Sequence, residues 1–290
     1  MNKNNAEVLW HYTSIDTLVK ICTNLTMRAT HYAFMNDAEE VKMGANSILT
    51  AIEDMSKTQE DKDAFNYLRA RLNDLLGAPI LNLFYIISFS KNRDALSQWR
   101  GYTPTCGGCA IGFDASKLEQ ALSKKIASKY GIRYAPIALA NCIYPKTETA
   151  IQLTAKPFLT RIKDIYKLRN ENNQGMIESK TFQDFWQLMS FVYCVKNPCF
   201  EEEQEKRLVF SHIAPYSTIQ FENRKPFLEI SIDPKIFPDL IKEVIISPHG
   251  AVEKNIQFVR FFSHALDEKY NYKAPKGLLF PVTESKLPYR

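Results

Sequence analysis

Residues 7–24 read Glu-Val-Leu-Trp-His-Tyr-Thr-Ser-Ile-Asp-Thr-Leu-Val-Lys-Ile-Cys-Thr-Asn, and this stretch already indicates the class of the fold. The apolar residues Val8–Trp10 predict a strand over Glu7–Tyr12. Thr13-Ser14 follows as a helix N-cap, because a hydroxyl side chain accepts a hydrogen bond from an unpaired amide of the first turn. Apolar side chains then recur at helical spacing, and Leu25–Ala29 forms the next strand. Strand, helix and strand in close succession indicate a protein that mixes both elements.

The same signals alternate along the rest of the chain. Asn36-Asp37 predicts a turn and a second helix N-cap. The helical pattern that follows continues to about Leu76 and is interrupted near Lys57-Thr58. Further helices are predicted at 94–100, 150–171, 181–195 and 253–268. Further strands are predicted at 83–90, 109–113, 132–144, 207–210, 227–232 and 243–247. We therefore expect one α+β domain over residues 1–290, with a basic helical insertion at about 145–200.

The composition is that of an ordinary globular protein. The 290 residues are 45% hydrophobic and 24% charged, which excludes collagen-like, low-complexity and disordered chains. The longest nearly apolar run, Ala78–Phe89, is shorter than the roughly 20 residues that a membrane-spanning helix needs. The polar first residues do not resemble a signal peptide. We expect a cytoplasmic protein that does not bind membranes.

The six cysteines are too sparse for a disulfide scaffold. Cys106 and Cys109 form a lone CxxC, which is compatible with a zinc site or with a glycine turn flanked by small buried thiols. A structural zinc site normally needs a second such pair or closely spaced histidines. Because the five histidines are isolated, we favour the turn and expect no metal.

The net charge of +5 is concentrated in the middle of the chain. Residues 101–200 hold 13 basic and 7 acidic residues, and nearly all of the excess lies within 117–180. Much of it falls on a predicted helix at 157–169 with an apolar stripe. This segment is either a face for nucleic acid or the solvated face of an amphipathic helix. The second interpretation is favoured because aromatic residues are not interleaved with the basic ones.

Two clusters combine aromatic and polar side chains. His11-Tyr12-Thr13 ends the first strand next to a helix N-terminus, which is a common place to bind phosphate. Alternatively, the histidine is a hydrogen-bonded structural residue.

The second cluster follows another strand: Ser88 and Ser90 end this strand before Ser97-Gln-Trp-Arg-Gly-Tyr102. An aromatic ring there could stack on a heterocycle, or Trp99 could simply pack in the core.

A third cluster, Phe200-Glu-Glu-Glu-Gln-Glu-Lys-Arg207, is rich in carboxylates. Most of them fit a solvated charge run. Strand alternation, however, predicts that Glu203, Glu205 and Arg207 share one face. Such a row at the start of a strand is suited to holding a ribose hydroxyl and to stabilising an adjacent cation.

Together these segments resemble the ADP-ribosyltransferase superfamily, and in particular an uncharacterised bacterial family, a domain of unknown function, that is grouped with it. The segments that carry the resemblance are Leu9-Trp-His-Tyr-Thr-Ser14, Phe34-Met-Asn-Asp-Ala-Glu-Glu40, Ser97-Gln-Trp-Arg-Gly-Tyr102, Gly108-Cys-Ala-Ile-Gly-Phe-Asp114 and the Glu-x-Glu-x-Arg row. The resemblance implies two small mixed or antiparallel sheets, split around a central cleft that binds NAD. It departs from the superfamily where a His-Gly pair is common, because Tyr12 follows His11.

The resemblance also implies roles for individual residues. Glu205, or failing it Glu203, would bind the nicotinamide ribose and stabilise the oxocarbenium character that develops as nicotinamide leaves. His11 would hold the adenosine-side ribose, and Trp99 or Tyr102 would stack on nicotinamide. The NAD-binding set so implied is His11, Tyr12, Thr13, Arg28, Ser90, Trp99, Arg100, Tyr102 and Arg207, with the three arginines as candidates for the pyrophosphate.

Three functions follow as hypotheses. The first is an NAD-consuming enzyme that transfers ADP-ribose to a macromolecule, protein or nucleic acid, or to water. The resemblance implies a bacterial toxin or an anti-phage defence effector as its setting. The second is a nucleic-acid-binding or nucleic-acid-modifying protein that uses residues 117–180. The third is a catalytically inactive nucleotide sensor.

Overall fold

The computed structural model describes residues 7–35, 38–77, 84–123, 136–170, 192–211, 219–274 and 277–288. The opening predicted from the sequence is confirmed. Strand β1 (Val8–Ser14) leads into helix α1 (Ile15–Asn24), and strand β2 (Thr26–His31) follows. The Ser14 hydroxyl caps α1 by accepting a hydrogen bond from the Thr17 amide at 3.0 Å.

The described strands form one mixed, mostly antiparallel sheet in the order β10-β9-β4-β1-β3-β2-β8-β7, with β6 and β5 continuing from β3. Only the pair β9–β10 is parallel among the strands described. The remaining strands are β3 (Phe84–Ser90), β4 (Gly108–Asp114), β5 (Pro136–Asn141), β6 (Glu205–Ser211), β7 (Gln220–Glu222), β8 (Lys225–Ser231), β9 (Ile241–Ile246) and β10 (Val282–Glu284).

The sheet divides where β1 leaves β3. Strand β1 pairs with β4 along its whole length, but its register with β3 is limited to Trp10 opposite Ser90. The other end of β3 pairs with β2, at Ile86 and Tyr85. Strands β1 and β2 therefore flank the two ends of the same edge of β3 and diverge between them, a place that we call the fork. The resemblance implied two separate sheets, but the described strands form one sheet with two parts. Its two parts are joined between β1 and β3 by the pair Trp10–Ser90.

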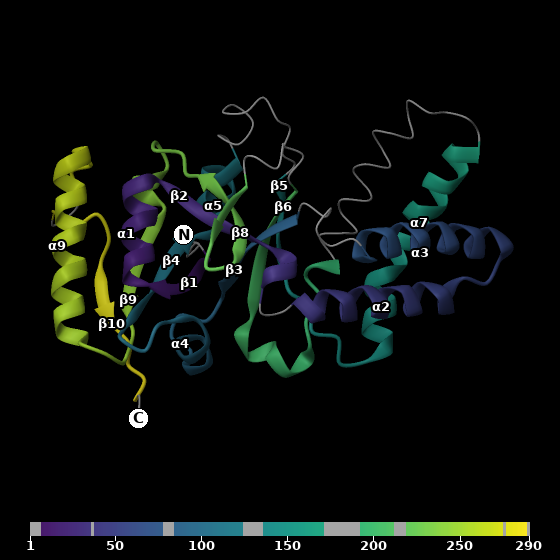
Figure 1. Ribbon diagram of the computed structural model, residues 1–290, viewed down its shortest axis with the longest axis horizontal. Coiled ribbons are helices and arrows are strands. Elements are labelled where there is room, and N and C mark those ends of the chain that lie inside the picture. The colour runs from purple at the N-terminus through teal and green to yellow at the C-terminus, as the bar shows by residue number, and fades with distance from the viewer. Residues whose placement is uncertain are drawn as a thin grey trace, which may run out of the picture.

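Helices cover both faces of the sheet. Helices α1, α5 (Ala115–Ser123) and α9 (Val252–Tyr270) pack on one face through the largest apolar core. On the other, α4 (Leu96–Tyr102) covers Trp10 and Tyr12, while α2 (Ala38–Met55), α3 (Gln59–Gly77) and α7 (Glu148–Asn170) share a second core with β3 and β6. Figure 1 shows α2, α3 and α7 gathered at one end of the molecule and α9 at the other.

The basic segment forms the long helix α7, and it packs against α2 and α3. Two of its lysines form ion pairs with the acidic start of α3, Lys163 with Asp61 at 2.6 Å and Lys167 with Glu60 at 2.9 Å. These contacts favour the interpretation of α7 as an amphipathic helix over its interpretation as a face for nucleic acid. The helix predicted at 181–195 lies mostly outside the described residues.

Among the described residues, no helix is both long and apolar enough to span a bilayer. None of the described His, Cys, Asp and Glu residues cluster in threes or more in a way that could hold a metal ion. The CxxC segment forms a turn in which Gly107 has a φ of +118°. Cys109 is buried, as expected, but Cys106 is exposed, so the expectation of two buried thiols is wrong for Cys106.

Candidate active site

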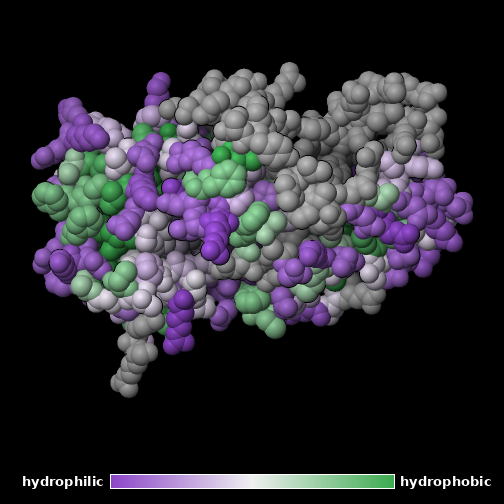
Figure 2. Space-filling model, viewed as in Figure 1, coloured by the Kyte–Doolittle hydropathy of each residue, from purple (hydrophilic) through white to green (hydrophobic). Residues whose placement is uncertain are grey.

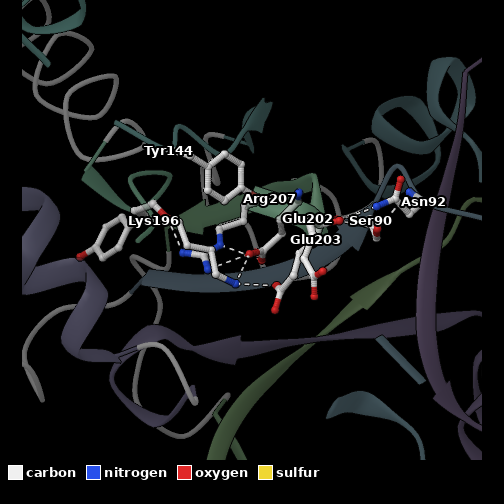
Figure 3. A network of polar contacts seen from close by, with 9 residues as sticks. Ser90, Asn92, Tyr144, Lys196, Glu202, Glu203 and Arg207 are labelled. Atoms are coloured by element: carbon white, nitrogen blue, oxygen red, sulfur yellow. Dashed lines mark hydrogen bonds and ion pairs between the residues drawn. The ribbon is translucent and has the colours of Figure 1, made fainter. Parts of the chain in front are cut away.

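Four charged side chains, Lys196, Glu203, Glu205 and Arg207, form a buried cluster that we call the charge network (Figure 3). Lys196 Nζ donates to Glu203 Oε2 at 2.6 Å and to Glu205 Oε2 at 2.9 Å. Arg207 donates to both oxygens of Glu205, from Nε at 2.8 Å and from Nη2 at 3.0 Å. Two cations and two carboxylates therefore compensate one another away from water, which is the condition under which charges are tolerated in a protein interior.

The backbone around the charge network holds it in place. Arg207 Nη1 donates to the carbonyl of Tyr193 at 2.7 Å, which joins β6 to the segment that carries Lys196. The Glu205 amide donates to the Tyr144 hydroxyl at 2.8 Å, and the Glu205 carbonyl accepts from the Cys142 amide at 2.8 Å. Glu205 is thus fixed through its main chain and its side chain together.

The predicted Glu-x-Glu-x-Arg row is only partly a strand. Glu205 and Arg207 lie on the same face of β6, as alternation predicts. Glu203 instead ends the 3₁₀ helix η3 (Pro198–Glu203), and Gln204 between them has a left-handed φ of 42°. This turn brings Glu203 to the same lysine as Glu205, although the two residues belong to different elements.

The two carboxylates differ in how they are engaged. Burial alone would raise the pKa of Glu205, but Arg207 and Lys196 outweigh it and lower that pKa to about 2. Both oxygens of Glu205 are occupied by these cations. Glu203 accepts from Lys196 through Oε2, while its Oε1 has no hydrogen-bond partner among the described residues. Glu203 is therefore the carboxylate that retains the capacity to bind a ligand.

Strand β3 connects the charge network to the fork. The Ser90 hydroxyl donates to the Glu203 carbonyl at 2.7 Å, and Asn92 Nδ2 donates to the Glu202 carbonyl (Figure 3). Two residues earlier on the strand, the Ser88 carbonyl accepts from His11 Nδ1 at 3.0 Å. His11 thus supplies a hydrogen bond to β3 where β1 has diverged from it.

The state of the His11 ring follows from these surroundings. Burial lowers the pKa of His11 and outweighs the opposite effect of the Ser88 carbonyl. The ring is therefore neutral at pH 7, with its proton on Nδ1, because that nitrogen faces a carbonyl oxygen. Nε2 remains an acceptor, suited to a hydroxyl donor such as that of a ribose.

Trp99 and Tyr12 form a separate cluster under α4. Trp99 is fully buried, donates from Nε1 to Asp94 Oδ1 at 2.7 Å and meets the Tyr12 ring edge-on at 4.8 Å. The Tyr12 hydroxyl donates to the Asn92 carbonyl at 2.8 Å and accepts from the Ala95 amide. Both aromatic rings are thus structural supports for the segment after β3. Of the two aromatics expected to stack on nicotinamide, the structure leaves Tyr102 exposed.

The remaining predicted residues are spread around this region. Arg28 lies on β2, is paired with Glu222 and sits over the Phe227 ring. Arg100 is exposed on α4, and Thr13 is half-buried on β1.

Arg207, the third candidate for pyrophosphate, is fully buried, and its guanidinium is bound by Glu205 and Tyr193. The structure therefore brings together Glu203, Glu205, Arg207 and Ser90, whereas Arg28 lies on β2 and Arg100 and Tyr102 lie on α4.

Lys196 is the member of the charge network that the sequence analysis missed. It follows the apolar residues Val192–Val195, and its side chain is 1% exposed. A single lysine at the end of an apolar segment is the available signal, because lysine is rarely buried unless it is paired. Lys196 supplies, from a segment outside the carboxylate-rich cluster, a positive charge that balances the buried carboxylates Glu203 and Glu205.

We expect the protein to lose stability as the pH falls from about 5 to about 2. The pKa of Glu205 is near 2 in the folded protein against an ordinary 4.5, so its stabilisation is complete above pH 4.5 and is lost as the carboxylate is protonated. The shift corresponds to roughly 3 kcal/mol. Chemical denaturation at a series of pH values measures this loss.

A variant isolates the contribution of Glu205 in that experiment. Asp61, Asp114 and Glu243 also have lowered pKa values and act in the same direction. Glu205→Gln should start less stable at pH 7 and lose less of its free energy of unfolding between pH 5 and 2. Equal losses in wild type and variant would show that Glu205 is not held ionised.

Comparison with known proteins gives one family match. Residues 98–208 are similar to the family model described as "Protein of unknown function (DUF2971)". The matched segment runs from α4 to β6 and contains the whole charge network, whereas His11 and Arg28 precede it. No curated protein and no solved structure matches the chain.

Proposed function

We propose that this chain is a cytoplasmic, NAD-consuming enzyme of the ADP-ribosyltransferase type, with Glu203 at the reacting ribose. The observation that carries the proposal is the attachment of His11 and Glu203 to one short stretch of β3. Ser88, which binds His11, and Ser90, which binds the Glu203 backbone, are two residues apart, or about 7 Å along a strand. A neutral histidine and a carboxylate so placed are suited to the two riboses of one dinucleotide.

The chemistry required of the site is the departure of nicotinamide. The bond between the ribose C1′ and the nicotinamide nitrogen breaks, nicotinamide leaves with the electron pair, and the ribose acquires positive charge. A carboxylate fixed next to that charge lowers the barrier, because it needs no reorganisation when the charge appears. Water or a nucleophile of a macromolecule then attacks C1′ and loses its proton.

The charge network gives Glu203 and Glu205 different roles in this proposal. Lys196 binds Glu203 through Oε2 and leaves Oε1 for the ribose. Glu205 neutralises Lys196 and Arg207, so that Lys196 can be buried beside Glu203 without an uncompensated charge. Glu205, the first choice from the resemblance, is thus assigned a positioning role and Glu203 the contact with substrate.

The remaining contacts with NAD are assigned to side chains that are exposed in the structure. Tyr102 is proposed for stacking on nicotinamide and Arg28 or Arg100 for the pyrophosphate, because these side chains are exposed. Thr13, near the end of β1, is proposed to line the binding site beside His11. The setting that we propose, a toxin or an anti-phage effector, rests on the resemblance alone.

Mass spectrometry tests the transferred group. The protein is incubated with NAD alone, with nucleic acid and with cell lysate, and each mixture is searched for free nicotinamide and for a product heavier by one ADP-ribose. The proposal expects nicotinamide in at least one mixture. Intact NAD in all of them, with NAD binding retained, would replace the proposal by the nucleotide-sensor hypothesis, which the complete pairing of Glu205 also suits.

We expect His11→Ala to raise the KM for NAD about fivefold with a smaller effect on kcat, because one ribose hydrogen bond is worth about 1 kcal/mol. His264→Ala, at an exposed position on α9, is the control and should leave both constants unchanged. Steady-state kinetics of nicotinamide release measures the difference. An unchanged KM in a correctly folded His11→Ala protein would remove His11 from the binding site.

A further inference from the structure

A row of exposed side chains runs along the outer face of α9. Lys254, Phe258, Phe261, Ala265 and Glu268 are all exposed, with Phe258 49% and Phe261 75% exposed. The opposite face of the helix is buried against the main core through Ile256, Val259, Ser263 and Leu266. Exposed phenylalanine side chains of this kind mark an interaction surface when they are contiguous.

The spacing of the row is that of a helix–helix seam. Its members follow one another at intervals of four, three, four and three residues, the spacing by which two helices pack along their length. Its middle is apolar and its two ends are charged. The row therefore has the form of a short coiled-coil seam without a partner helix among the described residues.

The row also faces away from the rest of the molecule. Helix α9 forms one end of the protein in Figure 1, beyond α1 and β10, and Figure 2 shows hydrophobic surface at that end. The charge network and the fork lie elsewhere in the sheet, so a partner docked on α9 would leave the proposed active site open.

The charges at the two ends of the row are opposite in sign, so the row is complementary to a second, antiparallel copy of itself. Lys254 lies seven residues before Phe261, and Glu268 lies seven residues after it. When a second copy of α9 is laid antiparallel across Phe261, Lys254 of each copy meets Glu268 of the other. Glu253 and Lys269, eight residues before and after, repeat the match. A parallel arrangement would instead place like charges together, which is unfavourable.

We propose that the protein forms a homodimer with twofold symmetry through antiparallel α9 helices, with Phe261 near the axis. Such an interface uses the same surface on both subunits, as twofold dimers require. Phe258, Phe261 and Ala265 supply its apolar centre, and the Lys254–Glu268 pairs close its two ends. The inference is independent of the proposed function, because it uses no residue of the active site.

Sedimentation velocity over a range of protein concentrations tests the dimer. Wild type is expected to reach twice the 33.4 kDa mass of the chain. Phe261→Glu should weaken the dimer at least about thirtyfold, since it removes an aromatic side chain at the centre of the interface and adds like charges there. Phe221→Glu on β7 is the matched control, because Phe221 is 74% exposed but lies on another element. A monomeric wild type, or a dimer insensitive to Phe261→Glu, would overturn the proposal.

Charge reversal tests the antiparallel arrangement separately. Lys254→Glu and Glu268→Lys should each be monomeric, because each places like charges at both ends of the row. An equimolar mixture of the two variants should form a heterodimer, since every facing pair is then opposite in charge. Failure of the mixture to associate, with both variants melting like wild type, would contradict the proposed arrangement.

Discussion

Replacing Arg207 with methionine is expected to lower the free energy of unfolding by about 3–5 kcal/mol. The substitution removes both contacts to Glu205 and the contact to the Tyr193 carbonyl. Methionine fills part of the space but leaves Glu205 with Lys196 as its only cation among the residues that the structure describes. A buried carboxylate that has lost a partner costs much more than the average polar change, because water cannot replace the missing donor.

Lys206→Met provides a matched control on the same strand. Lys206 is adjacent to Arg207, lies on the opposite face of β6 and pairs with the half-exposed Glu7 at 2.7 Å. The Lys206 side chain is 13% exposed and its partner Glu7 is 46% exposed, so water can solvate Glu7 after the substitution and the expected cost is about 1 kcal/mol. Chemical denaturation of both variants at pH 7 gives the comparison. Similar losses in the two variants would show that the charge network contributes no more to stability than a surface pair.

Replacing Glu203 with glutamine is expected to reduce nicotinamide release by about 100- to 1,000-fold. Glutamine has nearly the same shape and can still accept a hydrogen bond from Lys196. It carries no negative charge, so it cannot stabilise the positive charge on the ribose. The expected loss of stability is about 1–3 kcal/mol, because Lys196 keeps its contact with Glu205 while the charge network then holds two cations and one carboxylate.

Glu202→Gln is the control for this variant. Glu202 is the preceding residue, is exposed, and contributes its backbone carbonyl, not its carboxylate, to the contact with Asn92. It should retain full activity. If Glu202→Gln were to lose as much activity as Glu203→Gln, the effect would come from the net charge of the segment and not from one carboxylate.

Much of the secondary structure was predictable from local patterns. The N-cap at Ser14 and the break between α2 and α3 near Lys57 are where the sequence places them, because capping and helix interruption depend on neighbouring residues. The three-residue strand β10 was not predicted. Its pairing with β9 joins segments almost 40 residues apart, and so short a strand has no recognisable pattern of its own.

The candidate site was predictable in its residue types but not in its contacts. Alternation placed Glu205 and Arg207 on one face, and the structure confirms this. The left-handed Gln204, which turns Glu203 toward Lys196, has no sequence signal, because glutamine rarely adopts that conformation. Trp99 packs with Trp10 and Tyr12, and Asp94 accepts the hydrogen bond of its buried indole nitrogen. Residue spacing alone could not distinguish this packed ring from an open stacking ring.

The rate of nicotinamide release from NAD, measured by chromatography for wild type and Glu203→Gln under identical conditions, tests the central claim most directly. We predict measurable release by wild type and a loss of about two orders of magnitude or more in the variant, with both proteins folded at the assay temperature. Equal rates in the two proteins would contradict the assignment of Glu203. The absence of release by wild type with every acceptor tried would contradict the proposed reaction itself.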